Sequence, residues 1–196
     1  NKVDLLYLSL PNGEAQKIIK KNIKYTHLKF IDLSADFRIE NAKNYKTWYL
    51  KKHSAKNLIN KTIYSIPELT KHNVKNYRII SNPGCYPTSI QLALIPLIKK
   101  NLLETKNIII DSKSGFSGAG KNYKDKFTHK NIDKSVFAYG IEKHRHMSEL
   151  DQELKKIKKE KVEYVFNPHL LPTFRGILSS IYVSPKKNVS ITKIYS

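Results

Sequence analysis

Apolar and polar positions follow one another along the first third of the chain in blocks of strand and helix length. Two apolar runs of strand length, "VDLLYLSLP" (3–11) and "LKFIDLSADF" (28–37), flank a segment with a helical pattern, "EAQKIIKKN" (14–22). Strand, helix and strand in this order are typical of a parallel sheet with helical crossovers. In the polar, aromatic-rich stretch that follows, "NYKTWYLKKH" (44–53) predicts a helix and "SIPEL" (65–69) predicts a loop.

The second half of the chain has longer strand patterns. "YRIIS" (77–81) is expected to be a buried strand, and further strands are expected at "NIIIDSKSG" (107–115), "VEYVFNPHLLP" (162–172) and "GILSSIYVSP" (176–185). "HMSELDQELKKI" (146–157) predicts a helix, since Leu150, Leu154 and Ile157 recur at helical spacing. Ser148 and Asp151 have the spacing of an N-terminal capping box. The predicted fold class is therefore α/β.

Composition places the chain among soluble proteins. The 196 residues are 40% hydrophobic, which is enough for a substantial core. No stretch approaches the roughly 18 consecutive apolar residues of a membrane span, and the first residues do not resemble a signal peptide. A single cysteine cannot form an internal disulfide, so a reducing cytoplasm is the expected location.

The net charge of +20 raises the question of nucleic-acid binding. Almost all 36 basic residues are lysines scattered along the chain, and only four are arginines, the residue type expected for bidentate recognition of bases and phosphates. This distribution argues against a nucleic-acid partner. It favours a solvated lysine surface that also attracts anionic substrates.

The only cysteine, Cys85, lies in the segment "SNPGCYPTS" (81–89). Pro83 and Gly84 predict a tight turn after the 77–81 strand, and Pro87 suits the first turn of a helix. Cys85 is therefore expected at or just before a helix N-terminus, where the backbone N–H groups favour the nucleophilic thiolate and can hold an oxyanion. A small buried apolar role is the alternative.

Two more segments carry candidate chemistry. His144 and His146 precede the helix at 146–157 and are candidate proton acceptors for the cysteine. They do not form a metal site, because H-x-H and one distant cysteine lack a full ligand set. "SKSGFSGAGK" (112–121) is a glycine-rich loop in which small residues would let backbone N–H groups approach an anion, with Lys121 adding charge. A flexible connection is an equal alternative for this loop.

Taken together, the segments resemble the N-acetyl-gamma-glutamyl-phosphate reductase family. The similar motifs occur in the same order over essentially the whole chain: "LSADFR" (33–38), "SNPGCYPT" (81–88), "SGFSGAG" (114–120), "HRH" (144–146) and "PHLLPTFRGILSSIYV" (168–183). The resemblance implies an enzyme like aspartate-semialdehyde dehydrogenase, with a partial Rossmann-type parallel sheet in residues 1–82 and an incomplete α+β catalytic and dimerisation domain in residues 83–196. No G-x-G-x-x-G turn follows the first strand, so the chain is expected to be a fragment that lacks both ends of the family's fold.

The resemblance also implies roles for individual residues. Cys85 would attack the acyl phosphate to form a thioester, His144 would serve as acid and base, and NADPH would reduce the thioester in a step of arginine biosynthesis. The implied residues that hold the substrate are Arg38, Asn82, Arg145, His146 and Arg175. Those implied at the cofactor are Ser114, Gly115 and Gly118. The implied partners are a small acyl-phosphate substrate and further copies of the chain, as a dimer or tetramer.

Two positions depart from the family's pattern, and several alternatives stay open. Asn12 stands where many members have His, and Phe174 stands where a polar residue is common. The alternatives are the related acyl-phosphate reductase of lysine biosynthesis, aspartate-semialdehyde dehydrogenase, a thiol hydrolase, and a binding domain whose cysteine is inert.

Overall fold

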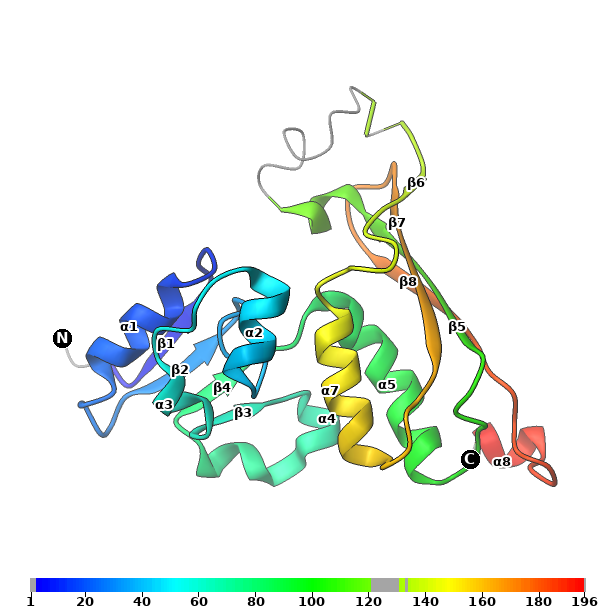
Figure 1. Ribbon diagram of the computed structural model, residues 1–196, viewed down its shortest axis with the longest axis horizontal. Coiled ribbons are helices and arrows are strands. Elements are labelled where there is room, and N and C mark those ends of the chain that lie inside the picture. The colour runs from blue at the N-terminus through cyan, green and yellow to red at the C-terminus, as the bar shows by residue number, and fades with distance from the viewer. Residues whose placement is uncertain (1–2, 121–130, 133, 196) are drawn as a thin grey trace. The chain divides into compact units, whose positions relative to one another are not determined.

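The chain forms two compact units, Asn1–Gly84 and Cys85–Ser196 (Figure 1). The computed structural model describes residues 3–120, 131–132 and 134–195. Lys121, expected to add charge to the glycine-rich loop, lies outside the described residues. Each unit has its own sheet and its own hydrophobic core.

The first unit is built on a four-stranded parallel sheet. The strands are β1 (Leu5–Leu8), β2 (Lys29–Asp32), β3 (Thr62–Tyr64) and β4 (Ile79–Ser81), in the order β1-β2-β4-β3. The parallel sheet and the α/β class predicted from the apolar runs are confirmed. Strand β2 is shorter than its apolar run, because the Asp32 carboxylate accepts hydrogen bonds from the backbone N–H groups of Ser34 and Phe37 and turns the chain.

One face of this sheet is covered by helices. Ala15 and Ile19 of α1 (Glu14–Asn22) pack with Phe30 and Ile79 of the strands, and all four are completely buried. The other helices of the unit are short: α2 (Ala42–Tyr49), α3 (Lys56–Ile59), α4 (Pro67–Thr70) and the 3-10 helix η1 (Lys71–Asn76). The expected loop at 65–69 is thus partly wrong, since proline at the first helical position allows one turn of helix to begin there.

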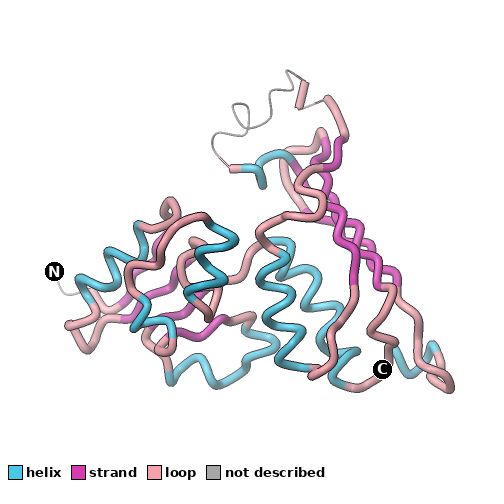
Figure 2. The backbone as a smooth tube through the Cα atoms, in the orientation of Figure 1, coloured by secondary structure: helices cyan, strands magenta, loops and turns pink. Residues whose placement is uncertain are grey.

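The second unit contains a mixed sheet. Its strands are β5 (Ile108–Gly115), β6 (Phe137–Ala138), β7 (Tyr164–Leu171) and β8 (Ile177–Tyr182), in the order β6-β7-β5-β8. Strand β5 pairs in parallel with β7 and antiparallel with β8, and β6 pairs antiparallel with β7. Figure 2 shows β5, β7 and β8 running beside one another as long strands. A 3-10 helix, η2 (Phe116–Ala119), follows β5, and α8 (Ile191–Tyr195) follows β8.

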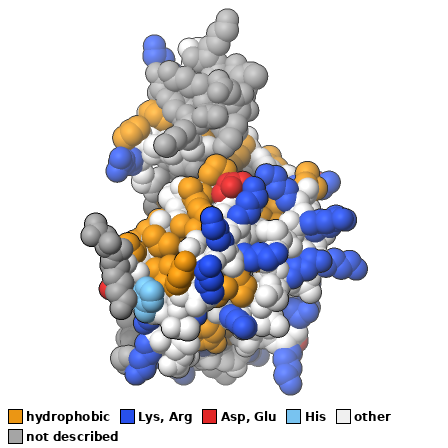
Figure 3. Space-filling view, turned by 90° about the vertical axis from the view of Figure 1, so that its left-hand side faces the viewer, with side chains coloured by type: hydrophobic (Ala, Val, Ile, Leu, Met, Phe, Trp, Pro, Cys, Tyr) orange, Lys and Arg blue, Asp and Glu red, His pale blue; other side chains and the backbone are white. Residues whose placement is uncertain are grey.

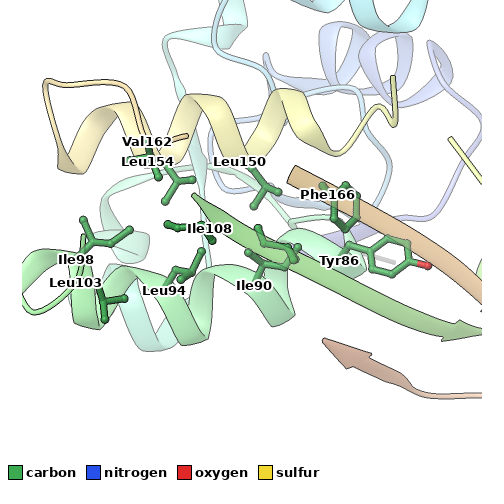
Figure 4. Packing of buried hydrophobic residues seen from close by; sticks show 11 residues of the cluster. Tyr86, Ile90, Leu94, Ile98, Leu103, Ile108, Leu150, Leu154, Val162 and Phe166 are labelled. Carbon is green, nitrogen blue, oxygen red and sulfur yellow. The ribbon is translucent and has the colours of Figure 1, made fainter. Parts of the chain in front are cut away.

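Two helices, α5 (Cys85–Lys99) and α7 (Met147–Ile157), cover one face of the mixed sheet and form the core with it. Figure 4 shows Ile90 and Leu94 of α5 pointing toward Leu150 and Leu154 of α7, with Ile108 of β5 in the same cluster. These five side chains are at most 2% exposed. The core fixes the start of α5, and with it the position of Cys85, relative to the segment that leads into α7.

The opposite face of this sheet carries exposed apolar side chains. Val165, Ile109 and Tyr182 are paired across three neighbouring strands and are 56%, 46% and 60% exposed. Leu178 of β8 is 63% exposed and is paired with Lys113 of β5. An apolar row of this kind on a sheet face is typical of an interaction surface.

The capping box expected at the start of α7 is wrong. The helix begins at Met147, so Ser148 lies inside it and its hydroxyl donates to the carbonyl of Arg145 at 2.6 Å. Asp151 lies one turn further on, where its carboxylate accepts a hydrogen bond from the hydroxyl of Tyr164. Backbone hydrogen bonds hold the start of the helix instead, since the N–H groups of Met147 and Ser148 donate to the carbonyls of His144 and Arg145.

The surface is strongly basic. Figure 3 shows Lys and Arg side chains spread over one face of the molecule, with few Asp or Glu side chains among them. Within the described part of the chain, no helix combines the length and the apolar character that crossing a membrane requires.

Candidate active site

Cys85 is the first residue of α5, and its side chain is exposed. Strand β4 ends at Ser81, and only Asn82, Pro83 and Gly84 separate it from the helix. The first turn of a helix has backbone N–H groups without intrahelical partners, and these favour an anion at that point. The expected position of Cys85 at a helix N-terminus therefore agrees with the geometry, and its exposed side chain does not fit the alternative of a small buried apolar role.

The sulfur shares a pocket of about 340 Å³ with both histidines of the "HRH" segment. All lining residues belong to the second unit: Cys85, Tyr86, Ser114, Gly118, Ala119, Tyr139, Gly140, Lys143, His144, Arg145 and His146. None of these described lining residues is acidic, and Lys143 and Arg145 are cations. The pocket thus joins a thiol, an imidazole and positive charge.

His144 is held by aromatic rings. Its ring centroid lies 5.5 Å from that of Tyr86, 5.4 Å from that of Tyr139 and 5.5 Å from that of Phe166, each in an edge-to-face arrangement. Burial, and then the charge of Arg145, lower the pKa of His144 to about 4. The imidazole is therefore uncharged near neutral pH.

His146 differs from His144 in its surroundings. It is 7% exposed, and its Nε2 lies 3.9 Å from Oε1 of Glu149, which is completely buried one helical turn further on. A carboxylate at this distance competes with an anionic ligand for the ring. Arg145, between the two histidines, is exposed and lines the pocket together with Lys143.

The glycine-rich loop contributes small residues to the pocket, and two of its glycines have a packing reason. A Cβ on Gly115 would lie 2.7 Å from the backbone nitrogen of Arg175 and 2.8 Å from the carbonyl atoms of Phe174. A Cβ on Gly118 would lie 2.7 Å from Oγ of Ser114. Ser114 and Gly118 line the pocket, whereas Gly115 holds η2 against the turn between β7 and β8.

Arg175 lies in that turn and is exposed. Its guanidinium group sits 5.1 Å from the ring centroid of Phe174, which packs edge to face on Phe116. It is not among the described residues that line the pocket. The structure thus brings together six of the ten candidate site residues, namely Cys85, Ser114, Gly118, His144, Arg145 and His146.

Arg38 and Asn82 belong to the first unit and contact each other there. Nε of Arg38 donates to the backbone carbonyl of Asn82 at 2.8 Å, and a terminal nitrogen donates to the carbonyl of Leu33 at 3.1 Å. Arg38 is only 8% exposed. Its guanidinium group therefore ties the end of β2 to the segment that leads to Cys85.

Four lining residues were missed by the sequence analysis: Tyr86, Tyr139, Gly140 and Lys143. The hydroxyl of Tyr139 donates to that of Tyr86, which donates to the backbone carbonyl of His169, both at 3.1 Å. Burial raises the pKa of both tyrosines, so both hydroxyls stay protonated. Only adjacency to Cys85 and to the "HRH" segment pointed to Tyr86 and Lys143, and no local pattern pointed to Tyr139.

Comparison with known proteins defines the protein family to which the chain belongs. The family model described as "Semialdehyde dehydrogenase, dimerisation domain" matches residues 85–196, and "Semialdehyde dehydrogenase, NAD binding domain" matches residues 1–77. The chain therefore belongs to the semialdehyde dehydrogenase family. Aspartate semialdehyde dehydrogenase II from Vibrio cholerae has the same fold, with a TM-score of 0.66 at 16% identity over 98% of this chain and 58% of that one.

The curated relatives show a more specific sequence similarity, to N-acetyl-gamma-glutamyl-phosphate reductases. The chain is 45% identical to the probable chloroplastic N-acetyl-gamma-glutamyl-phosphate reductase of Arabidopsis thaliana, over 92% of this chain and 45% of that protein. It is 43% identical to N-acetyl-gamma-glutamyl-phosphate reductase of Clostridium kluyveri, over 98% of this chain and 56% of that protein. The chain thus spans about half the length of the curated relatives it matches.

Proposed function

We propose that the protein containing this chain reduces N-acetyl-glutamyl phosphate to the semialdehyde with NADPH, through a thioester on Cys85. The observation that carries the proposal is the pocket in which Cys85, at the start of α5, meets His144 and the cations Lys143 and Arg145. The names of the curated relatives supply the substrate, and the family resemblance implies the place in arginine biosynthesis.

The pocket suits acyl transfer from a phosphate. The Cys85 thiolate forms a carbon–sulfur bond to the acyl carbon, and the bond between that carbon and the phosphate oxygen breaks. Lys143 and Arg145 attract the acyl phosphate, and the N–H groups at the start of α5 stabilise the oxyanion. Arg38, Asn82, His146 and Arg175 remain proposed substrate contacts, of which His146 is disfavoured by Glu149.

The residues around the sulfur fit the nicotinamide end of the cofactor. Ser114, Gly118 and Ala119 have small side chains and line the same pocket as Cys85, so they leave room for a flat ring beside the sulfur. Bound NADPH would supply the hydride that reduces the thioester. Gly115 is the weakest of the proposed cofactor residues, because close backbone packing already explains why it is a glycine.

The proposal extends to the two units. Residues 1–82 would form part of the dinucleotide-binding domain, and residues 83–196 would supply catalysis and contacts between copies. A second copy is the occupant we propose for the exposed sheet face with Val165, Ile109, Tyr182 and Leu178, since the dimerisation-domain match covers all four strands of that sheet. A cytoplasmic location remains a prediction.

The test is NADPH oxidation with N-acetyl-glutamyl phosphate, using the chain with all flanking sequence that its gene encodes. Cys85→Ala is expected to lower kcat by more than about 1,000-fold, because it removes the nucleophile. Substrate is expected to protect Cys85 of the unmodified protein from iodoacetamide.

The unfolding midpoint serves as the control. Cys85 is exposed, so Cys85→Ala should leave the midpoint within about 2 °C of the parent protein. Turnover that persists in Cys85→Ala would contradict the thioester, and turnover only with an aminoadipate or aspartyl phosphate would contradict the substrate.

A further inference from the structure

Three serine hydroxyls lie in contact between α5 and the mixed sheet of the second unit. Ser112 of β5 and Ser179 of β8 are cross-strand partners, and their hydroxyl oxygens are 2.7 Å apart. Oγ of Ser179 also lies 2.8 Å from Oγ of Ser89, which follows Cys85 by one turn of α5. The three hydroxyls thus connect β5 and β8 to the start of the helix that carries the sulfur.

The number of protons fixes the direction of these hydrogen bonds. The hydroxyl of Ser89 donates to the backbone carbonyl of Tyr86 at 2.9 Å, and a hydroxyl has only one proton to donate. Ser89 must therefore accept from Ser179. Because Ser179 has then used its own proton, it must accept from Ser112. The serine chain therefore runs from Ser112 through Ser179 and Ser89 to the carbonyl of Tyr86, the residue next to Cys85.

The serine chain lies among apolar contacts. Ile110, two residues before Ser112 on the same side of β5, is completely buried and is paired with Ile181 of β8. Ile90 of α5 is also completely buried in this core. Apolar contacts have no preferred direction, whereas an O–H···O bond needs its oxygens about 2.5 to 3.0 Å apart. The serine chain therefore restricts the position of α5 along the sheet more tightly than the apolar core alone.

The serine chain also joins two sides of the Cys85 pocket. Ser114 lies two residues after Ser112, on the same side of β5, and lines the pocket. Cys85 lies one helical turn before Ser89 and lines the same pocket. The hydroxyls thus fix the distance between the strand that carries Ser114 and the helix that carries the sulfur.

We propose that Ser179 is a positioning residue, which holds the sulfur of Cys85 in place by tying the start of α5 to β5. Its hydroxyl is the middle member of the serine chain, so both bonds between serines depend on it. Without it, the completely buried Ser112 would lose the acceptor that Ser179 provides, and a buried donor without an acceptor favours local rearrangement. The expected effect on turnover rests on the proposed function, whereas the effects on the helix and on the thiol do not.

Hydrogen–deuterium exchange of Ser179→Ala, in the chain with all flanking sequence that its gene encodes, tests the tie between α5 and β5. The amides of residues 89–92 donate to the carbonyls of the first turn of α5, and their exchange is expected to become at least about threefold faster. The amides of α7 should keep their rates, because the apolar core between α5 and α7 is unchanged. Equal acceleration in α5 and α7, or none in either, would overturn the proposal.

Ser180→Ala is the matched control. Ser180 is the next residue of β8, so it lies on the opposite face of the sheet. The same substitution is made there without touching the serine chain. This variant should match the parent protein in exchange, in thiol reactivity and in turnover, and a change in exchange near Cys85 as large as that of Ser179→Ala would contradict the proposal.

The reactivity of Cys85 is the second readout, followed by mass spectrometry of the peptide that contains it. A loosened first turn aligns fewer backbone N–H groups with the sulfur, so Ser179→Ala should react with iodoacetamide about threefold more slowly at pH 7. With substrate and NADPH, kcat should fall about 10- to 100-fold with KM within about twofold. An unchanged or faster alkylation rate would overturn the positioning role even where Cys85→Ala is inactive.

A double-mutant cycle tests whether the hydroxyls act as one chain. Ser89→Ala removes the next bond and should slow the alkylation of Cys85 to a similar extent. The double variant Ser89→Ala/Ser179→Ala should then react no more slowly than the slower single variant, because either change already breaks the connection. Losses that multiply in the double variant would show that the two serines act separately, and would overturn the proposal.

Discussion

Asp32 shows how a single carboxyl group can be held inside the first unit. It is completely buried at the end of β2, and its two oxygens accept from the backbone N–H groups of Ser34 and Phe37. Burial raises the pKa of Asp32 to about 6, although the Ser34 hydrogen bonds oppose the rise. The folded state therefore binds a proton more tightly than the unfolded chain, whose carboxyl has a pKa of 3.8.

This shift predicts a pH-dependent effect of Asp32→Asn. The stability that Asp32 contributes is fully present below pH 3.8 and is lost as the pH rises through 6. Relative to the parent protein, the variant should gain up to about 3 kcal/mol in unfolding free energy between pH 4 and pH 8. Urea unfolding at several pH values measures the difference. A difference between Asp32→Asn and the parent protein that stays flat over this pH range would contradict the prediction.

At the scale of elements, α5 carries both the nucleophile and much of the core. Its first residue is Cys85, and its inner face buries Ile90, Leu94 and Ile98 against α7 and β5. A helix tethered along its whole inner face keeps its N-terminus in place, which the proposed thioester chemistry requires. The core and the site thus depend on the same element.

Two leucines on α5 test how much its buried inner face contributes to stability compared with its exposed face. Leu94 is 1% exposed and Leu92 is 37% exposed. Leu94→Ala should cost about 2 to 5 kcal/mol of unfolding free energy, because it leaves a cavity between α5 and α7. Leu92→Ala should cost less than about 1 kcal/mol. Chemical denaturation monitored by circular dichroism measures both, and equal losses would show that the inner face of α5 does not hold the second unit.

At the scale of the whole molecule, the second unit has one sheet face covered by α5 and α7 and one face that is exposed. Apolar side chains lie in one row across β7, β5 and β8 on the exposed face. A charged cluster lies among them, in which Asp111 contacts Lys113 and Nδ1 of His169. Apolar area with a paired polar centre is what a self-association surface needs.

Leu178→Lys tests whether this surface joins two copies. Burying a lysine against apolar side chains is costly, so the variant should lower the self-association constant by at least about 100-fold. Sedimentation velocity of the parent protein and the variant measures the change. Ile191→Lys, at a position in α8 that is 71% exposed, should assemble like the parent protein. An unchanged sedimentation profile for Leu178→Lys would place the contact elsewhere.

The local sequence pattern was enough to predict several features of the fold and of the site. The helix α1 follows its sequence pattern residue for residue, and α7 differs from its pattern by a single residue at the start. The position of Cys85 at a helix start also followed from its neighbours, since proline and glycine restrict the backbone wherever they occur. These features depend on residues within a few positions of one another, and that information is fully present in the linear sequence.

Packing between segments that are far apart in the sequence decided the features that the local pattern did not predict. Tyr139 and Tyr86 are 53 positions apart yet share a hydrogen bond, and a buried tyrosine looks the same in sequence whether it fills a core or a pocket. The failed cap at Ser148, the mixed strand order of the second unit and the neutral ring of His144 have the same origin. Packing between distant segments sets the first two, and burial with the charge of Arg145 sets the third. All of these are properties of the folded chain in three dimensions.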